Sequence, residues 1–113
     1  MKLLAVAGPD ITGILSGLGH ETTVARDAEE FKRHLDSTVF DALVFEDVGV
    51  GLHMLKWFEK HADKRPKNIV VMAADQVRKE EIELLDGMCV VVEPGFQIEL
   101  GKALKRERAF EVT

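Results

Sequence analysis

Several kinds of residue and segment are scarce in this chain, and each scarcity excludes a class of protein. Among 113 residues there is one cysteine, Cys89, so an intrachain disulfide is excluded. It lies in the apolar run Met88–Val92, which predicts a buried small side chain and not a reactive thiol. No apolar run reaches the roughly 18 residues of a membrane span. The apolar start, Leu3–Ala7, ends too early for a signal peptide. We therefore expect a cytoplasmic protein.

Positive charge is also in deficit. The chain has 15 lysines and arginines against 20 acidic residues, a formal net charge of −5. An acidic chain binds nucleic acid and anionic lipid poorly, so we expect neither as a partner. The four histidines include no pair four residues apart and have no cysteine nearby, so no metal site is predicted. There is no tyrosine, and Trp57 lies on a predicted helix, so a flavin is not indicated and we expect no cofactor.

What the chain does contain is a set of short apolar runs. Four are continuously apolar, which is typical of strands buried on both faces of a parallel sheet. One is more polar and is predicted to be an edge strand. The four continuous runs are Leu3–Ala7, Ala42–Phe45, Ile69–Ala74 and Met88–Val92, and the more polar run is Thr22–Ala25.

Helical patterns separate these runs. Asp27 and Glu30 have the spacing of a capping box. A short helix with Asp10 as its cap is expected between Pro9 and Gly19. A loop at Gly49–Gly51 is expected to precede a helix whose apolar face holds Leu52, Leu55 and Phe58. The remaining helices are predicted at Gln76–Leu85, with Gly87 as its terminator, and at Gln97–Arg108.

Strict alternation of strand and helix predicts an α/β domain over residues 1–113. We expect a flavodoxin-like, five-stranded parallel sheet of order 2-1-3-4-5, with a shortened first helix. In such sheets ligands bind at the carboxyl ends of the strands, near the switch point between strands one and three. The residues at these ends are Ala7, Gly8 and Asp10, then Glu46 and Asp47, then Ala73, and finally Glu93 and Pro94.

Three segments resemble the response regulator receiver (CheY-like) superfamily. Asp41–Asp47 resembles the third receiver strand, which ends in the phosphoacceptor aspartate. Leu18–Asp27 resembles the run into the second strand and second helix. Val91–Pro94 resembles the end of the fifth strand, where the family has a lysine before a cis-proline. The resemblance implies a signal-transduction domain of two-component type.

By position, Asp47 matches the phosphoacceptor, but the surrounding pocket departs from the family. Ala7 and Gly8 stand where the family has an acidic pair that holds Mg²⁺. The phosphate-contacting lysine, the Ser/Thr of strand four and the aromatic switch of strand five are matched by Glu93, Ala73 and Val90.

Phosphoryl transfer depends on charge neutralisation by metal and cations. A cation ~5 Å from the phosphoryl group supplies about 3 kcal/mol at an effective dielectric of ~20. Glu93 reverses that sign. The resemblance therefore implies a degenerate pseudo-receiver: not an enzyme, but a phosphorylation-independent module for protein–protein interaction. The face of the fourth helix, fifth strand and fifth helix would bind a partner or a second copy, with Arg78, Lys79, Glu83 and Lys102 as exposed candidates.

Two alternatives stay open. One is a working two-component response regulator, phosphorylated on Asp47 with Mg²⁺ and using Asp10 or Glu46 as substitute ligands. The other, implied by resemblance only, is the N-terminal receiver-like domain of a ParA/MinD-like ATPase of pilus assembly.

Overall fold

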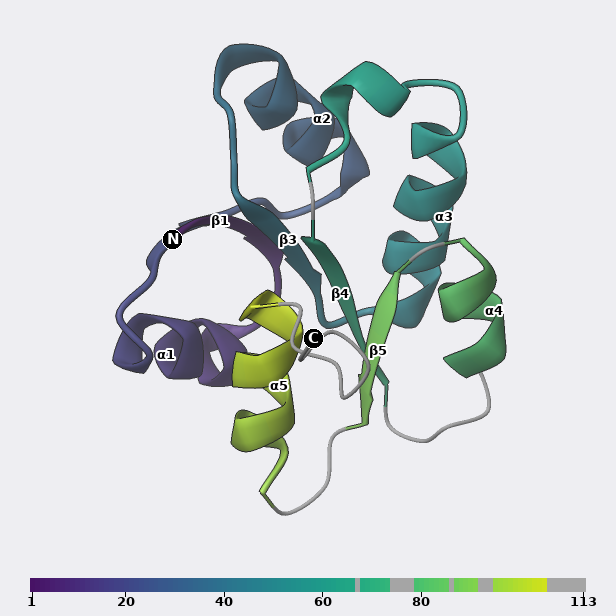
Figure 1. The fold of residues 1–113 in the computed structure, drawn as a ribbon. Coiled ribbons are helices and arrows are strands. Elements are labelled where there is room, and N and C mark those ends of the chain that lie inside the picture. Colours follow the sequence, from purple (N-terminus) through teal and green to yellow (C-terminus); the bar gives the residue numbers. More distant parts are fainter. Residues whose placement is uncertain (67, 74–78, 86, 92–94, 106–113) are drawn as a thin grey trace, which may run out of the picture.

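Strands and helices alternate through the part of the chain that the structure describes, as the apolar runs predict (Figure 1). The computed structural model describes residues 1–66, 68–73, 79–85, 87–91 and 95–105. The strands are β1 (Lys2–Val6), β2 (Glu21–Val24), β3 (Ala42–Phe45), β4 (Asn68–Ala73) and β5 (Met88–Val91). The helices are α1 (Pro9–Gly17), α2 (Ala28–Ser37), α3 (Val48–Phe58), α4 (Lys79–Leu84) and α5 (Phe96–Lys105), with a 3-10 turn, η1, at Ala62–Lys64.

The five strands form one parallel sheet in the order β2-β1-β3-β4-β5. The expected flavodoxin-like order 2-1-3-4-5 is confirmed, and the more polar β2 lies at an edge. The register pairs Val6 with Phe45, so β1 and β3 end side by side. This is the switch point at which the chain leaves the sheet in opposite directions, toward α1 and toward α3.

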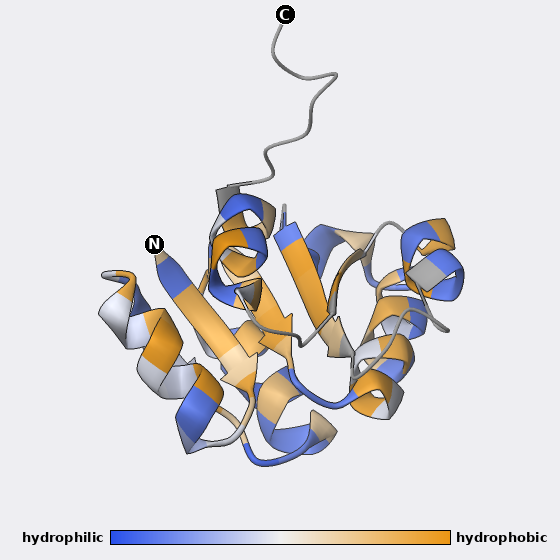
Figure 2. Cartoon of the chain, turned by 90° about the horizontal axis from the view of Figure 1, so that it is seen from below, coloured by the Kyte–Doolittle hydropathy of each residue, from blue (hydrophilic) through white to orange (hydrophobic). Residues whose placement is uncertain are grey.

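Helices cover both faces of the sheet and create two cores (Figure 1). Because strand side chains alternate between faces, Leu4 and Phe45 pack in the core beneath α2, α3 and α4. Leu3 and Val44 pack in the core beneath α1 and α5. Figure 2 shows strands that are mostly hydrophobic and helices with one hydrophobic and one hydrophilic side. In the described part of the chain, no helix has the length and apolar character needed to cross a membrane.

Two helix starts differ from the sequence prediction. The expected loop at Gly49–Gly51 is wrong, because α3 already begins at Val48 with Asp47 as its cap. Gly51 packs directly on the sheet: a Cβ there would lie 2.9 Å from both methyls of Val71.

Asp10 is not the cap of α1 either. Gly8 holds the cap position without a side-chain hydrogen bond, and Pro9 is the first helical residue, where proline is favoured. Asp10 lies in the first turn, where its charge complements the helix dipole.

Other boundaries follow the prediction more closely. Asp27 caps α2, accepting the amide hydrogen of Glu30 at 2.9 Å. The first helix is short, nine residues ending at Gly17. Of the predicted ranges Gln76–Leu85 and Gln97–Arg108, positions 76–78 and 106–108 lie outside the described residues. Gly87 closes α4 by donating its amide to the Ile82 carbonyl at 3.0 Å, and a Cβ there would lie 2.9 Å from Leu55.

A polar residue, Asn68, is buried at the start of β4, with 6% of its surface exposed. Its Nδ2 donates to the Leu104 carbonyl at 2.6 Å, which fastens the end of α5 to the sheet. Its Oδ1 is buried and has no hydrogen-bond partner among the described residues. The donor therefore stabilises the packing of α5, while the acceptor is an unsatisfied group.

Candidate functional site: the crevice at the switch point

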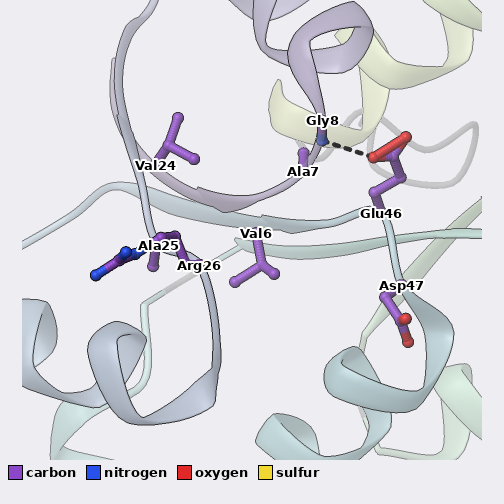
Figure 3. A pocket seen from close by; sticks show the side chains of 8 residues that line it. All are labelled: Val6, Ala7, Gly8, Val24, Ala25, Arg26, Glu46 and Asp47. Carbon is purple, nitrogen blue, oxygen red and sulfur yellow. Dashed lines mark hydrogen bonds between the residues drawn. The ribbon is translucent and has the colours of Figure 1, made fainter.

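A hollow of about 440 Å³ opens at the carboxyl ends of β1, β2 and β3 (Figure 3). It lies where the topology predicts a ligand site. Four of the lining residues are aliphatic, one is a glycine and three are charged: Val6, Ala7, Val24 and Ala25, then Gly8, then Arg26, Glu46 and Asp47.

Glu46 reaches from β3 across to β1. It directly follows Phe45, and its Oε2 accepts the amide hydrogen of Gly8 at 2.7 Å (Figure 3). A Cβ on Gly8 would lie 3.3 Å from that same oxygen. The carboxylate of Glu46 therefore fills the space into which a side chain at position 8 would begin. Because Gly8 is the N-cap of α1, this carboxylate also neutralises the positive end of that helix.

Asp47, the next residue, serves a different helix. Its Oδ1 accepts the amide hydrogen of Val50 at 3.1 Å and caps α3. Figure 3 shows its side chain over the start of α3, whereas Glu46 points toward Gly8. Both residues are exposed, and neither forms an ion pair with another described residue. The two adjacent acids thus satisfy the amino ends of the two helices that leave the switch point.

The cation among the lining residues is Arg26, which immediately follows Ala25 after β2. Its Nε binds Glu30 Oε2 at 3.0 Å, and its side chain is 87% exposed. In Figure 3 the guanidinium points away from Glu46 and Asp47. Sequence reasoning missed Arg26; the signal for it is its position just after the carboxyl end of an edge strand.

Solved structures with the same architecture identify the fold. One is the chemotaxis response regulator CheY4 of Vibrio cholerae, with a TM-score of 0.71 and 18% identity over 91% of this chain and 97% of that chain. Another is a two-component response regulator from Clostridium difficile, with a TM-score of 0.69 and 20% identity over 95% and 97%. This chain has the receiver fold.

A third solved receiver domain, that of the sensor histidine kinase PA1611 of Pseudomonas aeruginosa, aligns with a TM-score of 0.70 and 22% identity, over 93% of this chain and 94% of that chain. That structure has a magnesium ion coordinated in its active-site cleft. No protein-family model and no curated protein sequence matches the present chain. The receiver fold is therefore established by structural similarity.

The described residues of the crevice offer a magnesium ion fewer side-chain oxygens than the receiver pocket that the sequence resembles. Mg²⁺ requires oxygen ligands in nearly ideal octahedral geometry, and Ala7 and Gly8 offer no side-chain oxygen. Glu46 and Asp47 each accept a backbone amide. Of the two expected substitute ligands, Glu46 lines the hollow, whereas Asp10 is exposed on the first turn of α1 and does not. Within the described ranges, no three histidine, cysteine or acidic side chains gather closely enough to hold a metal.

The remaining predicted positions of the receiver pocket are scattered. Ala73 is the last residue of β4 and pairs in register with Val91. Val90 is 3% exposed and belongs to the core under α1 and α5. Glu93 and Pro94 lie outside the described residues, as does Arg78 of the predicted contact face. The structure thus brings Ala7, Gly8, Glu46 and Asp47 together around the hollow, and Asp10 and Val90 are not among its lining residues.

Proposed function

We propose that this receiver-fold chain is a pseudo-receiver: a regulatory domain that acts through a protein partner without phosphorylation. The observation that supports this most directly is the hydrogen bond from the Gly8 amide to Glu46 Oε2 at 2.7 Å. An internal anion already occupies the amide donor at the head of α1. Asp47, which matches the phosphoacceptor, is likewise engaged at the head of α3.

Electrostatics explain why phosphorylation of Asp47 would be unfavourable. A phosphoryl group on Asp47 brings about two negative charges beside the adjacent Glu46 carboxylate. At ~10 Å and an effective dielectric of ~20, each like-charge pair is repulsive by about 1.7 kcal/mol. That amount slows transfer more than about tenfold. Arg26 is turned away and bound to Glu30, so it does not offset the repulsion.

The cap on α3 adds a second penalty. To receive a phosphoryl group through Oδ1, Asp47 would have to release the Val50 amide. Loss of such a cap destabilises a helix by about 1 kcal/mol. The repulsion disfavours the working-regulator alternative at either carboxylate oxygen, whereas the cap disfavours transfer to Oδ1 alone.

A surface for the partner is available on the helices that flank β5. Leu84 on α4 is 86% exposed and Ile98 on α5 is 67% exposed. Charged residues accompany them: Glu80 and Glu83 line a hollow beside Leu84, and Lys102 is exposed on α5. Exposed apolar side chains that gather into one patch with a polar rim mark protein interaction sites. We infer that Leu84 and Ile98 belong to such a patch on the face of α4, β5 and α5.

Incubation with acetyl phosphate and Mg²⁺, followed by intact-mass measurement, tests the proposal. We expect no phosphate adduct under conditions that fully label an active receiver run in parallel. The matched variants are Asp47→Asn and Glu46→Gln, each of which keeps an oxygen to accept the same backbone amide. A stoichiometric adduct on the unmodified chain that disappears in Asp47→Asn would overturn the proposal. An adduct that forms only in Glu46→Gln would show that the Glu46 charge is the barrier.

A further inference from the structure

A second hollow lies along the outer side of α2 and is chemically unlike the crevice. It encloses about 320 Å³ and is lined by Arg26, Glu30, Arg33, His34 and Ser37; we call it the α2 groove. Two of the three arginines in the described part of the chain, Arg26 and Arg33, line it. With Glu30 as the acidic lining residue, the lining has a formal charge of +1 in a chain of net charge −5.

The groove already holds one carboxylate. Glu30 Oε2 binds the Nε edge of Arg26 at 3.0 Å. Arg33 is exposed and forms no ion pair with any described residue. The Ser37 hydroxyl donates to the Arg33 and His34 carbonyls, so the groove's attraction for anions comes from the guanidinium groups and His34. Guanidinium groups bind carboxylates in a planar, often two-point geometry. The groove therefore has room and unpaired donors for a second carboxylate.

The residues around the groove limit the size of the anion. Glu29 and Asp36 are exposed on the same helix and bind Lys32 and Lys64 respectively. Asp36 raises the pKa of Lys64, so that lysine stays cationic and committed to Asp36. A long polyanion such as nucleic acid, or an anionic membrane, would extend over these carboxylates and meet the net negative charge of the chain. A short anionic segment would meet the groove alone.

We propose that the α2 groove binds a short acidic segment of a partner protein through its side-chain carboxylates. This adds to the proposed function by naming a second contact surface and the chemistry of the partner. Arg26 lines both the groove and the crevice, which makes the two surfaces continuous. Because Glu46 and Asp47 repel carboxylates, the bound segment would run from Arg26 toward Ser37 and away from the crevice.

The test is a titration of the ¹⁵N-labelled full chain with an acetylated, amidated hexaglutamate peptide at low salt, followed by NMR. We expect saturable shifts concentrated on α2. Arg33→Glu should weaken binding about tenfold, because it replaces the unpaired donor with a repelling charge. Lys56→Glu is the matched control. It makes the same change in net charge on the exposed surface of α3, and we expect less than about a twofold effect.

The proposal would be overturned by the absence of saturable shifts on α2, or by an equal loss of peptide affinity in Arg33→Glu and Lys56→Glu. It would also be overturned if inorganic phosphate or duplex DNA bound as tightly as the peptide. Unchanged Trp57 emission and thermal unfolding would show that both variants are folded. The outcome is independent of acetyl phosphate labelling, which reports on Asp47. A failure of the groove and a failure of the proposed function are therefore distinguishable.

Discussion

At the scale of single residues, the two adjacent acids of the crevice show what sequence reasoning reaches and where it stops. The apolar run Ala42–Phe45 places Glu46 and Asp47 at the end of the third strand, as predicted. It does not reveal which backbone amide each carboxylate accepts. That depends on the register of β1 against β3 and on the missing side chain of Gly8, which leaves room for Glu46. Whether Asp47 retains phosphoacceptor activity stays a prediction.

Asn68 offers a stability test at this scale. Asn68→Ala removes the bond to the Leu104 carbonyl but also removes the unsatisfied Oδ1, so we expect a loss of about 1–2 kcal/mol in the free energy of unfolding. Asn68→Asp places a carboxylate against that carbonyl in a buried site and should lose more, about 3 kcal/mol or above. Urea unfolding followed by Trp57 fluorescence measures both variants. The difference in unfolding free energy between the two variants should narrow at low pH, where the aspartate is protonated. An Asn68→Asp variant as stable as the parent at pH 7 would contradict the argument.

At the scale of secondary structure, the glycines of α3 explain the largest error of the sequence prediction. Glycine disfavours helix interiors, so Gly49–Gly51 indicated a loop. The chain is helical there because Asp47 caps it and because Gly51 lets α3 approach β3 and β4 closely. Such an approach is a property of the packed molecule, and local propensity contains no information about it. The polar character of β2 and the N-cap of α2 at Asp27 are local signals, and the sequence predicts both correctly. Of the predicted capping box, the structure shows the Asp27 half, while the Glu30 side chain binds Arg26.

Gly51→Ala separates helix propensity from the close packing of α3 on the sheet. The substitution improves helix propensity by up to about 1 kcal/mol, but its methyl would meet Val71 at 2.9 Å and the Phe45 Cβ at 3.3 Å. Overpacking of this kind costs about 1–3 kcal/mol, so we expect a net loss of stability. Gly13→Ala on α1 is the matched control. Nothing lies within 4 Å of its added methyl, and we expect a gain of about 0.5–1 kcal/mol. Thermal unfolding measures the two; equal and positive shifts would refute the role given to Gly51.

At the scale of the whole molecule, the strand order and the two-faced packing were predictable because they depend on apolar runs and on alternation. The crevice at the switch point follows from the same topology. The sequence did not predict the role of Arg26 or the α2 groove, because both arise where the end of an edge strand meets the outer face of a helix. Both cores depend on one sheet: residues of β1 and β3 alternate between the core under α1 and α5 and the core under α2, α3 and α4.

This shared sheet predicts that both layers unfold together. Leu15 on α1 and Leu55 on α3 are fully buried in opposite cores, and Trp57 packs against the core that contains Leu55. Leu15→Ala should destabilise the chain by about 2–5 kcal/mol. It should lower the urea midpoint reported by Trp57 fluorescence as much as the midpoint reported by far-ultraviolet circular dichroism. Leu55→Ala should behave alike, whereas Leu84→Ala, at an 86% exposed position, should change stability by less than about 0.5 kcal/mol. If Leu15→Ala shifted only the dichroism midpoint, the layer of α1 and α5 would be an independent unit, and a partner bound to α5 could not influence the crevice through the sheet.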